Sequence, residues 1–107
     1  ASVEQVITYS DITIDKNKYE VRKNGEKLAL TLKEFELLKM LVENKGRVLT
    51  RDSLLDKIWG YDYAGETRTV DVHIRHLRQK IQDEDMNNPM IETIRGVGYR
   101  INDEGEK

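Results

Sequence analysis

The main indicator of this chain's fold is the segment Glu66–Ile81, which reads ETRTVDVHIRHLRQKI. Its apolar residues recur at helical spacing, so at about 100° per residue they share one narrow face of a helix. That face consists of Val70, Ile74, Leu77 and Ile81. The pattern predicts an amphipathic helix that packs one side against a core and leaves the other side to solvent or a partner.

The opposite face of this predicted helix is basic. It carries Arg68, Val72, Arg75, His76 and Gln79. Between positions 68 and 80, four Lys or Arg residues stand against one acid, Asp71. Arg and Gln side chains hydrogen-bond base edges and phosphates, and a small apolar side chain fits a thymine methyl group. Taken alone, such a face is more typical of an ordinary solvated helix, so the rest of the chain must decide.

Composition restricts the class of protein. The chain has 107 residues, 36% charged and 37% hydrophobic, with no Cys, which fits one soluble domain with a modest core. We find no signal-peptide pattern and no apolar run that could span a bilayer. The net charge of −2 gives no general support for nucleic-acid binding, so such a role must rest on where the charges lie. We interpret residues 1–5 as a linker or remnant of a longer protein, 6–102 as one domain, and 103–107 as an acidic tail.

Upstream of the basic helix, residues 6–30 have the features of a small antiparallel sheet. The predicted strands are Val6–Tyr9, Ile12–Asp15, Tyr19–Lys23 and Glu26–Leu30. Ser10-Asp11 separates the first two, and Asn24-Gly25 is a strong hairpin signal because both residues tolerate positive φ. The sheet holds no cluster of reactive side chains, so we expect it to be structural.

Two helices are predicted between this sheet and the basic helix. The first starts at Thr31, which forms a capping-box pattern with Glu34, and Gly46 is its expected C-cap. Its apolar face is broad enough for contacts with the sheet and with another helix: Phe35, Leu37, Leu38, Leu41 and Val42. The second helix runs from Arg51 to Trp59 between a Thr50 cap and Gly60. Its inward residues are Leu54, Leu55 and Ile58.

A hairpin is predicted after the basic helix. Ile91–Arg95 and Tyr99–Ile101 are interpreted as strands around Gly96-Val97-Gly98. The strands carry Thr93, Arg95, Tyr99 and Arg100, and hydroxyl and guanidinium groups of this kind bind phosphates. Two helices, a basic third helix and a Gly-tipped hairpin together predict an α+β winged helix-turn-helix, with an N-terminal antiparallel sheet and a C-terminal β-hairpin wing.

The chain resembles a known family, the output domain of OmpR/PhoB-type response regulators of bacterial two-component systems. The resemblance covers about Val6 to Ile101. It is carried by the runs Leu30–Leu38, Val48–Arg51 with Leu54-Leu55, Trp59-Gly60, Arg68–Arg75, Leu77–Lys80 and Thr93–Tyr99. It implies a bacterial, cytoplasmic transcription regulator that binds double-stranded DNA through the third helix, with no cofactor and no membrane contact.

The resemblance also implies roles for single residues. Base-reading positions are Val72, His76 and the wing residue Arg95. Positions on or near phosphates are Arg68, Thr69, His73, Arg75 and Arg78, and other backbone-contacting positions are Trp59, Thr93 and Tyr99. The loop expected to contact RNA polymerase consists of Gly60, Tyr61, Asp62, Tyr63, Ala64, Gly65 and Glu66.

The partners implied by the resemblance extend beyond this chain. Family members usually bind direct repeats as head-to-tail pairs, promoted when a sensor histidine kinase leads to phosphorylation of a receiver domain. That domain is missing here. His76 stands where some relatives have Arg, so base preference does not transfer at this position. The loop varies within the family, which leaves activation or repression open.

Three alternatives remain beside the DNA-binding interpretation. His73 and His76 lie about 60° apart on the helix and could share a metal ion, but structural and catalytic sites usually need three or four protein ligands. Catalysis is not expected, because no nucleophile triad, phosphate loop or carboxylate pair stands out. A winged helix used only for protein contacts needs no basic face, and salt-dependent binding to a duplex distinguishes it from the DNA reader.

Overall fold

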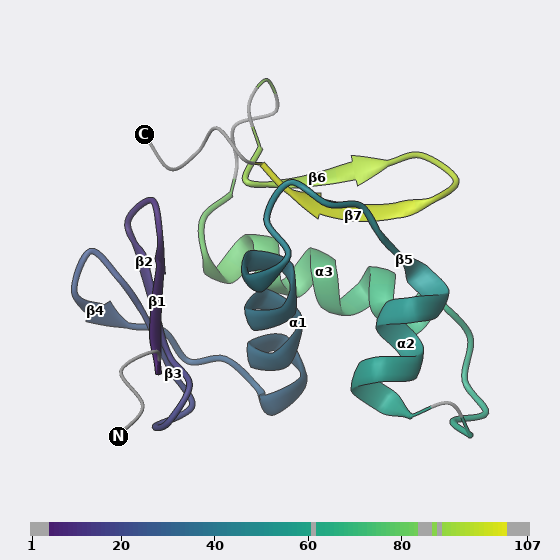
Figure 1. The fold of residues 1–107 in the computed structure, drawn as a ribbon, viewed down its shortest axis with the longest axis horizontal. Coiled ribbons are helices and arrows are strands. Elements are labelled where there is room, and N and C mark those ends of the chain that lie inside the picture. The colour runs from purple at the N-terminus through teal and green to yellow at the C-terminus, as the bar shows by residue number, and fades with distance from the viewer. Residues whose placement is uncertain (1–4, 61, 84–86, 88, 103–107) are drawn as a thin grey trace.

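Three helices lie between two antiparallel sheets in the part of the chain that the structure describes (Figure 1). The structure is a computed structural model, and it describes residues 5–60, 62–83, 87 and 89–102. The predicted acidic tail at 103–107 and most of the predicted linker at 1–5 fall outside these residues. Figure 1 shows the N-terminal sheet on one side of α1 and the C-terminal hairpin spread across the top of the helices.

The N-terminal sheet has the strand order β1-β2-β3-β4 in the described residues. Its strands are β1 (Val6–Tyr9), β2 (Ile12–Asp15), β3 (Glu20–Lys23) and β4 (Glu26–Lys27). Asn24 and Gly25 both adopt positive φ, as the hairpin prediction requires. The predicted return strand to Leu30 was too long. After Lys27 only the Leu28 N–H still bonds to the Val21 carbonyl, because the chain turns away to enter α1.

Helix α1 (Leu32–Glu43) begins as predicted, since the Thr31 side chain accepts from the Glu34 N–H and the Glu34 carboxylate accepts from the Thr31 N–H. Its predicted apolar face is buried, and it packs against α2, α3 and β7. The prediction for its end was wrong. Asn44 is the C-cap, whereas Gly46, at φ 84°, donates its N–H to the Ile101 carbonyl. Gly46 therefore joins the end of α1 to the last strand.

Helix α2 (Arg51–Trp59) is capped by Thr50 and ends at Gly60, both as predicted. The residues just before it form a short strand, β5 (Leu49–Thr50). β5 pairs with β7 (Gly98–Ile101), which in turn pairs with β6 (Ile91–Ile94). The hairpin of β6 and β7 is therefore part of a three-stranded antiparallel sheet, with the order β5-β7-β6 in the described residues. The base of the wing is thus tied to the start of α2.

Helix α3 (Arg68–Lys80) is the predicted basic helix, starting two residues later than the sequence pattern did. Its N-cap Thr67 makes no side-chain capping bond. Val70, Ile74, Leu77 and Ile81 are all at most 1% exposed, which confirms the apolar face. Burial of four such side chains contributes several kcal/mol, at about 1.5–3 kcal/mol each. This anchoring fixes which side of α3 is left outward.

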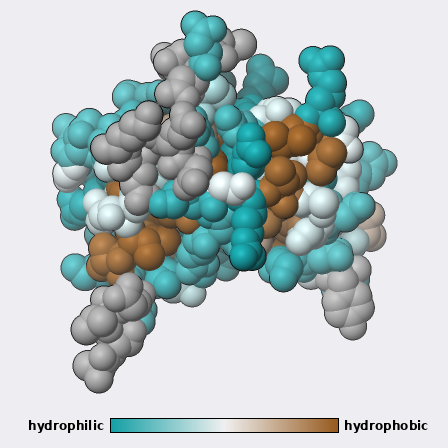
Figure 2. Space-filling model, turned by 45° about the horizontal axis from the view of Figure 1, so that its top comes forward, coloured by the Kyte–Doolittle hydropathy of each residue, from teal (hydrophilic) through white to brown (hydrophobic). Residues whose placement is uncertain are grey.

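Apolar side chains that reach the surface are dispersed over several elements. Among the described residues, the large ones are Val6, Tyr19, Leu32, Val48, Tyr63, Val72 and Val97. In Figure 2 the hydrophobic areas of the visible face are separated by hydrophilic side chains. None of the described helices is both long and apolar enough to cross a membrane.

Candidate nucleic-acid interface

The outward face of α3 carries the residues that the sequence pattern placed there. Arg68, Val72, Arg75, His76 and Gln79 are all exposed. Val72 is 43% exposed although it is apolar, and it lies one turn before His76. The structure records no ion pair for Arg68 or Arg75 with any other described residue. These guanidinium groups are therefore available to an anionic partner.

Trp59 and His73 form the edge of this face near the N-terminal half of α3. Their rings meet edge to face with centroids 4.9 Å apart. The Nδ1 of His73 lies 2.8 Å from the Thr69 carbonyl oxygen. Because a carbonyl only accepts, Nδ1 must carry the proton there, and Nε2 is left for another partner. Lys33 adds a cation 5.5 Å from the Trp59 ring centroid. Trp59 is half-buried, so it both packs and remains partly accessible.

Tyr99 of β7 and Asp71 of α3 form a hydrogen bond between wing and helix. The Tyr99 hydroxyl donates to Asp71 Oδ1 at 2.6 Å. The same carboxylate accepts two bonds from Arg51, Nε to Oδ1 at 3.1 Å and Nη2 to Oδ2 at 2.6 Å. Burial, together with the bond to Asp71, raises the pKa of Tyr99 to about 12. Tyr99 has only one hydroxyl proton, so the predicted phosphate contact through that proton would require it to leave Asp71.

Arg78 makes a second link between α3 and the wing. Its Nη2 donates to the Ile91 carbonyl at 2.6 Å and to Thr93 Oγ1 at 2.8 Å. Its guanidinium carbon also lies 5.8 Å from the centroid of the Tyr99 ring. Three predicted backbone-contacting residues, Arg78, Thr93 and Tyr99, are thus brought together. The Thr93 hydroxyl keeps its own proton for a further acceptor, because it accepts from Arg78.

The turn of the wing is exposed. Arg95, Gly96 and Val97 all face solvent, and the structure records no ion pair between Arg95 and another described residue. A small cavity of about 220 Å³ lies between this turn, Asp71 and Arg51. Arg100, further along β7, pairs instead with Glu92 across the hairpin at 2.7 Å. Of the two wing arginines, Arg95 is therefore the one left for an outside partner.

The connection between α2 and α3 was predicted to contact RNA polymerase. Of its residues, Tyr61 lies outside those that the structure describes. Asp62, Tyr63, Ala64, Gly65 and Glu66 are exposed. The Tyr63 ring packs over Gly65, where a Cβ would lie 2.1 Å from Tyr63 Cε2. It also lies 6.4 Å from Trp59 between ring centroids, so the loop is shaped by its aromatics.

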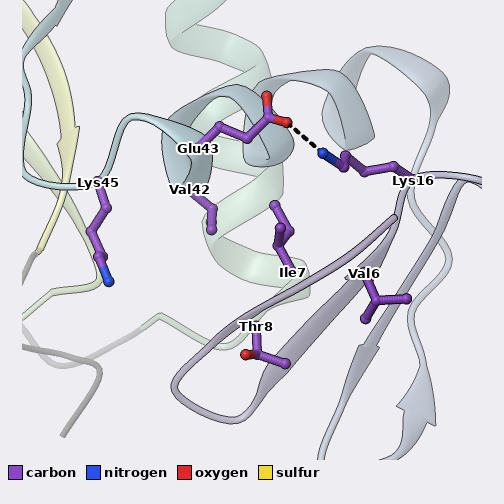
Figure 3. Close-up of a pocket in the computed structure, with 7 residues that line it drawn as sticks. All are labelled: Val6, Ile7, Thr8, Lys16, Val42, Glu43 and Lys45. Carbon is purple, nitrogen blue, oxygen red and sulfur yellow. Dashed lines mark hydrogen bonds and ion pairs between the residues drawn. The ribbon is translucent and has the colours of Figure 1, made fainter. Parts of the chain in front are cut away.

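Other places in the fold offer less chemistry. A larger cleft of about 500 Å³ lies between β1 and the end of α1 (Figure 3). Its lining is Val6, Ile7, Thr8, Lys16, Val42, Glu43 and Lys45. Lys16 and Glu43 pair across it at 3.1 Å, as Figure 3 shows. Within the described part of the chain, no three His, Cys, Asp or Glu side chains gather closely enough to hold a metal ion.

The helix-to-wing links were missed by the sequence analysis. In the sequence, Asp71 is simply the one acid in a basic helix, and Arg51 belongs to no functional pattern. One signal was present: Asp71 and Arg78 are seven positions apart, which places them on one side of a helix at about 100° per residue. That side faces neither the core nor the outward basic face, and the wing lies against it.

Comparison with known proteins agrees with this fold. A family model described as "Transcriptional regulatory protein, C terminal" matches residues 25–101. The sensory transduction protein RegX3 of Mycolicibacterium smegmatis is 45% identical over 96 residues, which cover 90% of this chain and 42% of that protein. RegX3 of Mycobacterium tuberculosis H37Rv is 44% identical, with the same coverage. The chain therefore spans less than half the length of these relatives.

Solved structures give the same assignment. The response regulator DrrB, a Thermotoga maritima OmpR/PhoB homologue, superimposes with a TM-score of 0.81 at 37% identity, covering 92% of this chain and 44% of that one. The Klebsiella pneumoniae RstA DNA-binding domain, solved in complex with the RstA box, gives 0.82 at 35% identity, covering 94% and 99%. The chain belongs to the family of C-terminal domains of transcriptional regulatory proteins, and it is a winged-helix DNA-binding domain of the OmpR/PhoB response-regulator type.

Proposed function

We propose that this domain binds double-stranded DNA sequence-specifically and thereby controls transcription as the output domain of a two-component response regulator. The observation that carries the proposal is the outward face of α3. There, arginines that form no ion pair with another described residue flank an exposed Val72 and His76. A helix anchored by four buried apolar residues presents this face rigidly, as major-groove readers do. The Klebsiella RstA domain, solved with its DNA box, supports the proposal because it has the same fold.

In this proposal α3 enters the major groove. Val72 and His76 read base edges, since Val72 offers an apolar contact to a thymine methyl group and His76 a single donor or acceptor. Arg68 and Arg75 pair with phosphates on either side. Thr69, His73 and Trp59 contact the DNA backbone from the edge of the face. Because His73 uses Nδ1 for its bond to the Thr69 carbonyl, its Nε2 is available for this contact.

The wing extends the contact along the duplex. Arg95 lies in an exposed turn and enters the minor groove. Where this groove is narrow, its negative potential is enhanced and attracts arginine. Arg78, Thr93 and Tyr99 lie beside the DNA backbone at the base of the wing. The Thr93 proton remains available to a phosphate, as does the rest of the Arg78 guanidinium.

Further partners belong to the proposal as well. A second copy binds the next direct repeat head to tail. The loop from Gly60 to Glu66 contacts RNA polymerase, and a sensor histidine kinase acts on a receiver domain elsewhere in the protein. The setting is the bacterial cytoplasm, and we propose neither enzymatic activity nor a cofactor for this domain.

A fluorescence-anisotropy titration with a random-sequence duplex tests the proposal. The logarithm of the binding constant should fall linearly with the logarithm of the salt concentration, with a slope of about −0.9 for each phosphate contacted. Enrichment of a preferred sequence from a random library then gives the operator, and the bound stoichiometry tests the head-to-tail pair. If no duplex binds even at low salt, DNA binding fails, and a protein-contact role for α3 and the wing replaces it.

A further inference from the structure

Asp71 occupies an unusual place for an acid, because it is the one carboxylate in a helix proposed to face phosphates. Its carboxylate accepts three hydrogen bonds from within the protein. Arg51 donates two hydrogen bonds to it, and Tyr99 donates a third, from a strand 28 positions further along the chain. The carboxylate therefore connects α2, α3 and the wing at one point.

The contacts around this point fix where the wing turn lies relative to α3. Besides its side-chain bonds to Asp71, Arg51 donates its backbone N–H to the Val97 carbonyl at the tip of the wing. The Tyr99 hydroxyl donates to the Asp71 carboxylate, and the centroid of its ring lies 5.8 Å from the Arg78 guanidinium carbon. Arg95 lies in the same turn as Val97 and lines the cavity that Asp71 and Arg51 border. A shift of the Tyr99 side chain would therefore move the strand that leads from Arg95.

A simpler explanation for Asp71 is its interaction with the helix dipole. An acid in the first turn stabilises a helix by about 0.3–1 kcal/mol whatever its partners are. That explanation accounts for the charge but not for the three convergent hydrogen bonds. It also predicts that loss of Asp71 would affect all contacts of α3 alike.

We propose that Asp71 is a positioning residue that orients the wing for DNA, so that Arg95 reaches its groove only while Asp71 holds Tyr99 and Arg51. The inference rests on the proposed DNA binding. It gives the Tyr99 proton a role inside the protein in place of a phosphate contact. It makes the wing contact dependent on a residue that itself touches no base.

A double-mutant cycle between Asp71 and Arg95 tests this dependence. Binding to a fluorescein-labelled random-sequence duplex at low salt is measured for the wild type, Arg95→Ala, Asp71→Ala and the double variant. We expect Arg95→Ala to weaken binding about tenfold in the wild type and less than about threefold in the Asp71→Ala background, since contacts in one network are not additive. His76→Ala should cost the same in both backgrounds, because His76 lies on the outward face of α3.

Glu92→Ala is the matched control. It removes one carboxylate and one Arg ion pair from the same wing, but its pair with Arg100 stays within the hairpin. Arg95→Ala should keep its full tenfold effect in that background. Circular dichroism establishes that each variant is folded. If Asp71→Ala does not fold, Tyr99→Phe removes the same helix-to-wing bond without altering a charge, and the cycle is run with it.

The outcomes separate the inference from the proposed function. A wild type that binds no duplex overturns both. Wild-type binding with an equal Arg95 effect in the Asp71→Ala and wild-type backgrounds leaves DNA binding intact and overturns the positioning role. A reduced Arg95 effect in the Asp71→Ala background, unchanged in the Glu92→Ala background, supports it. In the Asp71→Asn background, which keeps an acceptor for Tyr99, the effect of Arg95→Ala should be partly restored.

Discussion

Lys80 Nζ lies 2.7 Å from Glu34 Oε1, and this pair joins the last turn of α3 to the first turn of α1. The same carboxylate oxygen accepts the Thr31 N–H at 2.9 Å. The Glu34 side chain is only 4% exposed. One buried carboxylate therefore caps α1 and, at the same time, binds a lysine of the basic helix.

Replacing Glu34 by Gln should lower the free energy of unfolding at neutral pH by about 1–3 kcal/mol. The Gln amide oxygen can still accept from Lys80 and Thr31, but it lacks the negative charge that strengthens both bonds. Burial by itself raises the pKa of Glu34, but the bonds from Lys80 and Thr31 lower it below the ordinary 4.5 on balance. A lowered pKa contributes stability above the unfolded value and loses it as pH falls through the folded value. Urea unfolding of the wild type and of Glu34→Gln should therefore show that their difference in unfolding free energy narrows below about pH 4.5.

Glu43→Gln is the control for this prediction. Its pair with Lys16 is more exposed, at 38% and 26% for the two side chains. Exposed pairs contribute about 0–1 kcal/mol. A loss as large as that of Glu34→Gln would mean that the position of Glu34 in the fold is not what makes its pair strong.

Tyr99→Phe should become less destabilising at alkaline pH. The pKa of Tyr99 is raised from 10.0 to about 12, by burial first and by Asp71 second. A raised pKa contributes stability below the unfolded value and loses it as pH rises through the folded value. The difference in unfolding free energy between wild type and variant should be constant below pH 10 and shrink between pH 10 and about 12. A pH-independent difference would argue against the bond to Asp71.

Gly98→Ala should displace the wing. A Cβ at this position would lie 2.0 Å from the Leu49 carbonyl oxygen, where β5 and β7 meet. We expect a loss of about 3 kcal/mol, at the upper end for overpacking, and weaker DNA binding. Gly96→Ala is the comparison, since nothing lies within 4 Å of its Cβ but its φ is 76°. It should cost about 1 kcal/mol from backbone strain alone. Equal losses in thermal unfolding would contradict the steric argument.

Local features of the sequence predicted most of this fold. The Thr31–Glu34 capping box, the Asn24-Gly25 turn and the apolar face of α3 each depend on residues within a few positions, so pattern alone identifies them. The prediction of the basic outward face followed from the same periodicity. These elements were sufficient to reach the correct fold class.

Contacts between distant residues could not be predicted in this way. β5 is two residues long and forms only because β7 pairs with it, almost fifty positions later. The bonds from Arg51 and Tyr99 to Asp71 span 20 and 28 positions. Polar side chains carry no periodic signal for such partners. No sequence feature therefore indicated that the Tyr99 hydroxyl donates to Asp71.

Arg75→Ala should weaken binding to many DNA sequences alike. Arg75 is exposed on α3, and the structure records no ion pair between it and another described residue, so we expect it to pair with a phosphate. Loss of one phosphate contact should reduce the slope of log affinity against log salt concentration by about one. Arg22→Ala, which removes an exposed arginine from β3, should leave the slope unchanged. A slope that Arg75→Ala also leaves unchanged would remove Arg75 from the phosphate contacts.

Val72→Ala and His76→Ala should instead change which sequence is preferred. Both side chains are exposed one turn apart on the face of α3, so they should meet neighbouring base pairs. Loss of a base contact should reduce discrimination at the base concerned and change little elsewhere. Selection from a random duplex library should show relaxed preference at one position for each variant, with the salt dependence intact. If the enriched sequence stays the same, neither residue reads bases, and specificity must come from the wing or from DNA shape.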